Sequence, residues 1–168
     1  MGTISEKESL MIRTMNQLFQ SASSEEILSV IKITLDNSDE SPFWSEKVIP
    51  FSRAILSVLI PLREQNLLFD PEGEPQKELS TELFLCWCDL FSLRSLAFTL
   101  QKSNTTSVLK NTKYDMLTCK SYQEIDLENL GAYLSSNMID LENEMVDFPI
   151  TQYNLHVGIS DLIKKLIK

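Results

Sequence analysis

Glycine is scarce in this chain, with four among 168 residues, at Gly2, Gly73, Gly131 and Gly158. Phosphate-binding loops and tight β-hairpins depend on glycine because it adopts positive φ angles without a steric penalty. Neither the P-loop pattern G-x-x-x-x-G-K-[ST] nor the dinucleotide pattern G-x-G-x-x-G occurs in the sequence. Folds built on such loops are therefore disfavoured, and no nucleotide-binding or other cofactor site is expected within these residues.

Signals for helix starts recur through the first third of the sequence. Ser5 to Glu8 and Ser23 to Glu26 both match the capping box, in which a Ser hydroxyl and a Glu carboxylate satisfy free amides. The second helix is expected to end at residues 36–38. A third, longer helix begins at Ser41-Pro42, and its apolar residues extend almost around its circumference, which predicts a central helix surrounded by others. Pro50 is expected to kink this helix or to mark its true first turn.

The later part of the chain continues the helical pattern after a loop at residues 70–75, where two prolines and a glycine stop regular structure. Residues 102–113 are polar and weakly periodic, and we expect a mobile internal connection there. Further helices are predicted over residues 79–89, 92–101, around 127–134 and from 149 onward. The sequence therefore predicts an all-α fold, a compact bundle of about six to eight helices that forms one domain over residues 1–168.

Charge is unevenly distributed along the chain. The formal net charge is -9, which repels a phosphate backbone, so direct nucleic-acid binding is not expected. Residues 121–163 contain eight acidic residues and no Lys or Arg. We expect an electrostatic docking face for a basic partner in this stretch, with Glu142, Glu144 and Asp147 as the candidate partner-binding residues. The alternative interpretation is an ordinary solvated surface.

The spacing of the cysteines and the single histidine does not indicate a metal-binding or catalytic site. Three cysteines suit a reducing compartment, and Cys86 and Cys88 point roughly 200° apart on a helix, so they are expected to be buried core thiols rather than ligands of one ion. Cys119 is isolated, and His156, the one histidine, is expected to be structural and hydrogen-bonded. We therefore expect no catalytic and no metal-binding residues. Pairing of a cysteine with His156 as nucleophile and base stays open, because such pairs meet in space.

The strongest apolar run, Val48 to Leu62, is fifteen residues long and is interrupted by two prolines and an arginine. A membrane-spanning helix needs roughly 20 apolar residues, so this run is interpreted as a buried helix. No signal peptide is visible at the start of the chain. The expected location is cytoplasmic, with no membrane contact by this fragment.

Apolar and aromatic landmarks occur at intervals along most of residues 10–167. They are Pro42-Phe43-Trp44, Leu62-Arg63-Glu64-Gln65, Leu79 to Leu83, Leu90-Phe91-Ser92-Leu93, Gly131-Ala132-Tyr133-Leu134, Asp147 to Ile150 and Tyr153 to Gly158. Together they resemble the all-α domain of type IV coupling ATPases of the TraG/TraD and DotL kind. In that family, an inner-membrane, hexameric motor carries a helical insertion in its RecA-like ATPase domain, and the insertion helps to recruit substrates or relaxosome components.

The resemblance implies that residues 1–168 are a domain excised from a larger ATPase, and that the chain is no enzyme by itself. Its expected function is to recruit a secretion substrate, or a relaxosome or adaptor protein, on the cytoplasmic side of the channel. The ATPase domain of the same parent chain is the other expected partner. Phe43 and Trp44 are expected to be core residues. Two alternatives remain open: a free-standing acidic helical adaptor or secretion chaperone, and an enzyme that uses Cys86, Cys88 or His156.

Overall fold

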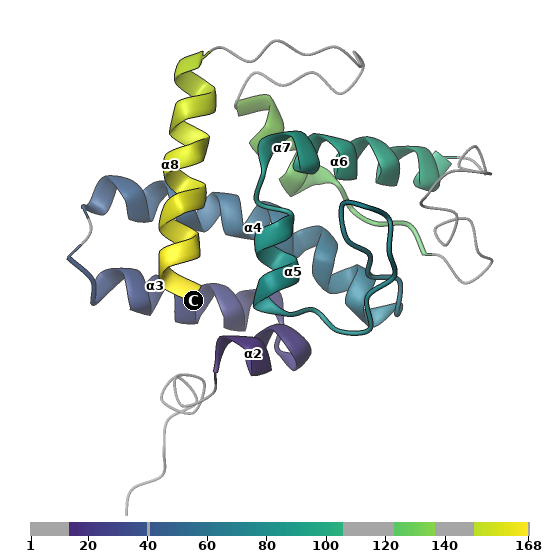
Figure 1. The fold of residues 1–168 in the computed structure, drawn as a ribbon, viewed down its shortest axis with the longest axis horizontal. Helices are drawn as coiled ribbons and strands as arrows, with labels where there is room; N and C mark the ends of the chain where they lie inside the picture. The colour runs from purple at the N-terminus through teal and green to yellow at the C-terminus, as the bar shows by residue number, and fades with distance from the viewer. Residues whose placement is uncertain (1–13, 40, 106–122, 137–149, 168) are drawn as a thin grey trace, which may run out of the picture.

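Seven helices account for most of the residues that the computed structural model describes, which are 14–39, 41–105, 123–136 and 150–167 (Figure 1). The only β feature in these ranges is an isolated bridge between Phe69 and Pro75. The predicted all-α bundle of six to eight helices is confirmed. The helices are α2 (Met15–Ser21), α3 (Ser24–Asp36), α4 (Pro42–Glu64), α5 (Thr81–Cys86), α6 (Leu90–Thr105), α7 (Glu128–Ser136) and α8 (Ile150–Ile167).

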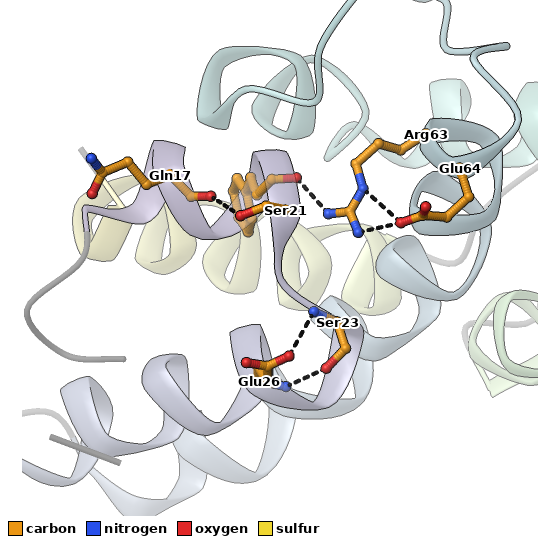
Figure 2. A network of polar contacts seen from close by, with 7 residues as sticks. Gln17, Ser21, Ser23, Glu26, Arg63 and Glu64 are labelled. Carbon is orange, nitrogen blue, oxygen red and sulfur yellow. Dashed lines mark hydrogen bonds and ion pairs between the residues drawn. The ribbon is translucent and has the colours of Figure 1, made fainter. Parts of the chain in front are cut away.

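The predicted capping box at the start of α3 is present. The Ser23 hydroxyl accepts the Glu26 N–H at 3.2 Å, and the Ser23 N–H donates to the Glu26 carboxylate at 3.2 Å (Figure 2). A second capping box, which was not predicted from the sequence, lies at the start of α2 and is formed by Thr14 and Gln17. The box predicted at Ser5 lies outside the described residues. Helix α3 ends at Asp36, as expected.

Helix α4 is central in the sense that α3, α7 and α8 all pack against it. The prediction that other helices surround it is wrong, because Glu46, Pro50, Arg53 and Glu64 are exposed along one side. It runs without a break from Pro42 through Pro50, so the expectation that Pro50 marks the first turn is wrong. An interior proline costs about 3 kcal/mol, since it removes one N–H donor and crowds the preceding turn. The packing of α3, α7 and α8 against α4 offsets that cost. The buried apolar residues of α4 are Val48, Phe51, Ala54, Ile55, Leu56, Val58, Leu59 and Leu62.

The carboxyl end of α4 is closed by a Schellman motif. Asn66 has a left-handed φ of 58° and donates its N–H to the Arg63 carbonyl, while the next N–H reaches the Leu62 carbonyl at 2.9 Å. The Arg63 guanidinium then donates to the Phe19 carbonyl at 2.7 Å and pairs with the Glu64 carboxylate (Figure 2). This contact fixes the end of α2 to the end of α4.

The loop predicted at residues 70–75 is confirmed. The Asp70 carboxylate accepts the backbone N–H groups of Glu72 and Glu74, and Gly73 adopts a φ of 86°. The buried Trp87 indole donates its N–H to the Phe69 carbonyl at 3.1 Å, which attaches the loop to the bundle.

Helices α5 and α6 differ in extent from the prediction. Helix α5 ends at Cys86 because Trp87 leaves the helical path, and α6 begins at Leu90. Helix α6 continues to Thr105, so residues 102–105 of the expected mobile connection are helical, and residues 106–113 lie outside the described residues. Figure 1 shows α8, in yellow, crossing α4, with α5 beside it. Helix α8 packs against α4 and α3.

Candidate functional site

Helix α8 has one covered face and one bare face. Its covered side chains include His156, Ile159 and Ile163, which join the core of the bundle. Its exposed residues recur three or four positions apart and so lie on one outer stripe: Asn154, Val157, Asp161, Lys164 and Lys165. Val157 is the apolar member of this otherwise polar stripe, and 37% of its surface is exposed. Core packing therefore does not account for an apolar residue at this position.

A partly exposed aromatic contact lies on one side of Val157. Tyr153 is one helical turn before Val157, and its ring centroid is 6.3 Å from that of Phe91 at the start of α6. Phe91 is 53% exposed, although it is a large apolar residue. Tyr153 is half-buried, so this pair presents an aromatic surface to solvent beside α8.

A second aromatic pair lies on the other side of α8, in the first turn of α4. Trp44 packs against α8 at Gly158, where an added Cβ atom would lie 2.6 Å from the indole ring. The Phe43 ring meets Trp44 at 5.2 Å, is 48% exposed and has the Lys47 ammonium 5.6 Å from its centroid. The expectation that Phe43 is a core residue is wrong, because this first turn of α4 is covered on one side only. Trp44 is half-buried against the core.

Phe43, Trp44, Phe91, Tyr153 and Val157 are called the α8 face from here on. It contains all of the large apolar side chains that the structure finds exposed among the described residues. Sequence reasoning missed it as a site. The signal that could have found it was Val157 within the polar stripe of the last helix, which periodicity alone shows.

A pocket of about 140 Å³ opens beside the α8 face, between α8 and the end of α5 with its connection to α6. Leu85, Tyr153 and Val157 contribute apolar surface, and Asp89, Asp161 and Lys164 contribute charged groups. The mixed lining is completed by Cys88, His156 and Ser160. The Asp89 carboxylate accepts the Ser92 N–H at 3.1 Å and so helps to start α6. The Asp161 and Lys164 side chains have no hydrogen bond or ion pair with any described residue.

His156 lines this pocket and connects α8 with α4, α7 and the segment between α5 and α6. Its Nε2 is 2.6 Å from the Cys88 carbonyl oxygen, its Nδ1 is 2.7 Å from the Tyr133 hydroxyl, and its ring packs on Phe51 at 5.2 Å. A carbonyl oxygen only accepts, so Nε2 carries the proton, and in the neutral ring Nδ1 accepts the Tyr133 hydroxyl proton. Burial lowers the pKa of His156, and the Cys88 carbonyl opposes that shift. The prediction of a structural, hydrogen-bonded histidine is confirmed.

Cys88 and His156 meet, but not through the thiol. The Cys88 sulfur lies 3.4 Å from the Phe84 carbonyl and donates to it, while the backbone carbonyl of Cys88 is the group that accepts from His156. Burial raises the pKa of Cys88, so the thiol stays protonated at neutral pH. A buried, protonated thiol is a poor nucleophile, and the contact does not form a cysteine–histidine catalytic pair.

Cys86 is exposed, so its prediction as a core thiol is wrong, whereas that of Cys88 is confirmed. The short helix α5 buries Leu83 and Phe84, and Cys86 falls beyond that face. Partial burial raises the pKa of Cys86, and the carboxylates of Glu82 and Asp70 raise it further. Cys119 lies outside the described residues.

The acidic candidates Glu142, Glu144 and Asp147 also lie outside the described residues, and their role stays a prediction. Within the ranges that the structure describes, no group of three or more His, Cys, Asp or Glu residues is arranged to hold a metal ion. Among the helices of those same ranges, none combines the length and the hydropathy needed to span a membrane. No protein-family model, curated protein or solved structure matches the chain.

Proposed function

We propose that this domain is a protein-docking module that recruits a partner on the α8 face, and that it does so as the helical insertion of a type IV coupling ATPase. One observation carries the docking role. The large apolar side chains that are exposed in the described part of the chain are Phe43, Phe91 and Val157. Val157 lies on α8, Phe91 contacts α8 through Tyr153, and Phe43 packs on Trp44, which reaches α8 at Gly158. Exposed apolar patches are typical of interaction sites.

The more specific role is supported by where the family landmarks lie. Pro42-Phe43-Trp44, Leu90-Phe91-Ser92-Leu93 and Tyr153 to Gly158 carry the resemblance to coupling ATPases, and they supply all five residues of the α8 face. In this role the partner is a secretion substrate or a relaxosome or adaptor protein. The ATPase domain of the parent chain would then drive translocation on the cytoplasmic side of the channel.

The proposal assigns no catalysis and no cofactor to this chain. A thiol enzyme needs a cysteine with a lowered pKa beside a base. The pKa values of Cys86 and Cys88 are both raised, and neither thiol is activated by His156. These observations favour a docking role over the alternative of a cysteine-dependent enzyme.

The test is photo-crosslinking from the α8 face in cells that express the chain in its native context. A benzophenone amino acid replaces Val157 in one variant and Lys77, an exposed residue of the α4–α5 loop, in the control variant. We expect Val157 to capture a defined partner that Lys77 does not capture. The added substitution Phe91→Ser should reduce that crosslink, because it removes an aromatic side chain of the same face.

The outcomes separate the two parts of the proposal. Equal crosslinking from positions 157 and 77 would reject docking on the α8 face. A specific crosslink to a protein outside any secretion or conjugation system would keep the docking role and reject the coupling-ATPase role. A substrate, an adaptor or the parent's ATPase domain is the partner that the full proposal requires.

A further inference from the structure

We propose that the pocket beside α8 receives one apolar side chain of a partner protein segment, and that this segment carries a basic residue next to its apolar anchor. The inference rests on the proposed docking role and adds the chemistry of the partner. Its basis is the size of the pocket, the composition of its walls and the balance of charge around them.

The size of the pocket limits what enters it. Its volume is about 140 Å³. A cavity of roughly 150 Å³ is large enough for a benzene molecule, so this pocket has room for one leucine, methionine or phenyl group. Leu85, Tyr153 and Val157 supply apolar contacts for such a group. A single buried anchor of this kind commonly provides much of the affinity of a protein interface.

The charges around the pocket favour a basic neighbour for that anchor. Two acidic residues, Asp89 and Asp161, and one basic residue, Lys164, line the pocket, so its lining carries an excess of one negative charge. Asp161 has no partner among the described residues, and a basic side chain from outside would give it one. The net charge of -9 on the whole chain also accelerates the approach of a basic partner.

The same charge disfavours the other occupants of an apolar face. A second copy of this chain brings a further -9, so self-association works against electrostatic repulsion at low salt. An anionic lipid surface is repelled for the same reason. A basic, amphipathic protein segment is therefore the occupant to which the proposal commits.

The first experiment compares two amphipathic helical peptides of equal length with the same leucine anchors, one with lysines and one with glutamates beside the anchors. Titration calorimetry of the folded domain at low and moderate salt gives the two affinities. We expect the lysine peptide to bind at least ten-fold more tightly, with a preference that shrinks as salt screens the charges. No detectable binding of the lysine peptide, or equal affinity of the two peptides, would overturn the proposal.

Charge reversal at the pocket tests the residues themselves. Asp161→Lys should weaken binding of the lysine peptide about two- to five-fold, the usual range for an exposed ion pair, and should strengthen binding of the glutamate peptide. Glu72→Lys makes the same charge change on the exposed α4–α5 loop and is the matched control. If both substitutions change affinity equally, only the net charge matters and the pocket assignment is wrong.

Blocking the pocket tests the apolar anchor. Val157→Trp places a large ring at the pocket, and we expect a loss of affinity of at least ten-fold. Asn154→Trp, at an exposed position of the same helix, should leave affinity within about two-fold. A concentration-dependent dimer in sedimentation that Val157→Trp abolishes would assign the face to a second copy and overturn the proposal. Crosslinking from Val157 is measured separately, so the docking role can stand while the partner chemistry fails.

Discussion

Helices α4 and α8 obey the same local rules but differ in what surrounds them. Helix α4 packs against α3, α7 and α8, and its eight buried apolar residues form one broad face that leaves Glu46, Pro50, Arg53 and Glu64 exposed. Helix α8 has α4 and α3 on one side, and on the other it carries the polar stripe that contains Val157. The difference separates two tasks. Helix α4 supplies more of the core, and beyond its first turn its exposed residues are Glu46, Pro50, Arg53 and Glu64, whereas α8 exposes the apolar residue Val157.

The largest expected effect comes from the core side of this comparison. Phe51 is fully buried on α4, with its ring against Tyr133 of α7 at 5.4 Å and His156 of α8 at 5.2 Å. Phe51→Ala should lower the free energy of unfolding by about 3–5 kcal/mol, because it leaves a cavity where three helices meet. Urea unfolding followed by circular dichroism measures the change.

Phe91 provides the matched control, since it is the same residue type but 53% exposed on the α8 face. Phe91→Ala should cost less than about 1 kcal/mol. A similar cost for the two substitutions would contradict the division between core and outward surface.

The next effect concerns the contact between the two helices. An alanine at position 158 would place its Cβ atom 2.6 Å from the Trp44 ring, so Gly158→Ala should destabilise the fold by about 1–3 kcal/mol despite the better helix propensity of alanine. Thermal unfolding measures the shift. In the Trp44→Leu background the clash is removed, and the same substitution should become neutral or stabilising.

Gly131 on α7 is the control for propensity alone, because nothing lies within 4 Å of a Cβ atom built there. Gly131→Ala should stabilise the protein by about 0.5–1 kcal/mol. If Gly158→Ala destabilises the protein and Gly131→Ala stabilises it, the steric constraint lies at the α4–α8 contact. Stabilisation at both would mean that the Trp44 ring moves aside freely.

The sequence predicted the position of α4 well because the signals for a helix start and for a broad apolar face are local. The predicted start at Ser41-Pro42 is confirmed, and the broad apolar face packs against three helices. The prediction that α4 is surrounded failed, because the apolar pattern does not show which side is left without a neighbour. The same rules failed for Phe43 and Cys86, which are apolar residues in helices near a boundary. Whether such a residue is covered depends on which other helices reach it, and periodicity within one segment does not contain that information.

The pocket could not be predicted from the sequence for a related reason. Val157 and Asp161 come from α8, whereas Leu85 and Asp89 come from a segment about seventy residues earlier. No local pattern connects these two segments. His156 shows the intermediate case: a structural, hydrogen-bonded histidine was predicted, but its partners Tyr133 and Cys88 were not.

A moderate, pH-dependent effect is expected at His156, on the covered face of α8. Burial lowers its pKa in the folded state below the ordinary value of 6.5, so the unfolded chain binds the proton more tightly. The contribution of this group to stability is therefore complete above pH 6.5 and is lost as pH falls below 6.5 toward the folded-state pKa. The slope reaches at most about 1.4 kcal/mol per pH unit for one proton.

His156 is the only histidine in the chain, so His156→Gln isolates this contribution. Urea unfolding at a series of pH values from about 7.5 to about 5 should show a smaller loss of stability in the variant than in the parent protein. Parallel curves for the two proteins would mean that His156 titrates as it does in the unfolded chain, and that the buried contacts with Tyr133 and Cys88 are not maintained in solution.

The smallest expected effect is that of Val157→Thr, and it tests the comparison directly because the same substitution can be made on α4. Val58→Thr on α4 puts a hydroxyl into a fully buried site and should cost about 1–3 kcal/mol. Val157→Thr on α8 keeps the side-chain shape at an exposed position and should change stability by less than about 0.5 kcal/mol. If Val157→Thr leaves the free energy of unfolding unchanged but lowers the affinity for the lysine peptide, the apolar residue contributes to binding and not to folding. A large loss of stability would instead show that Val157 is packed as a core residue. The outer side of α8 would then contribute to folding rather than to binding.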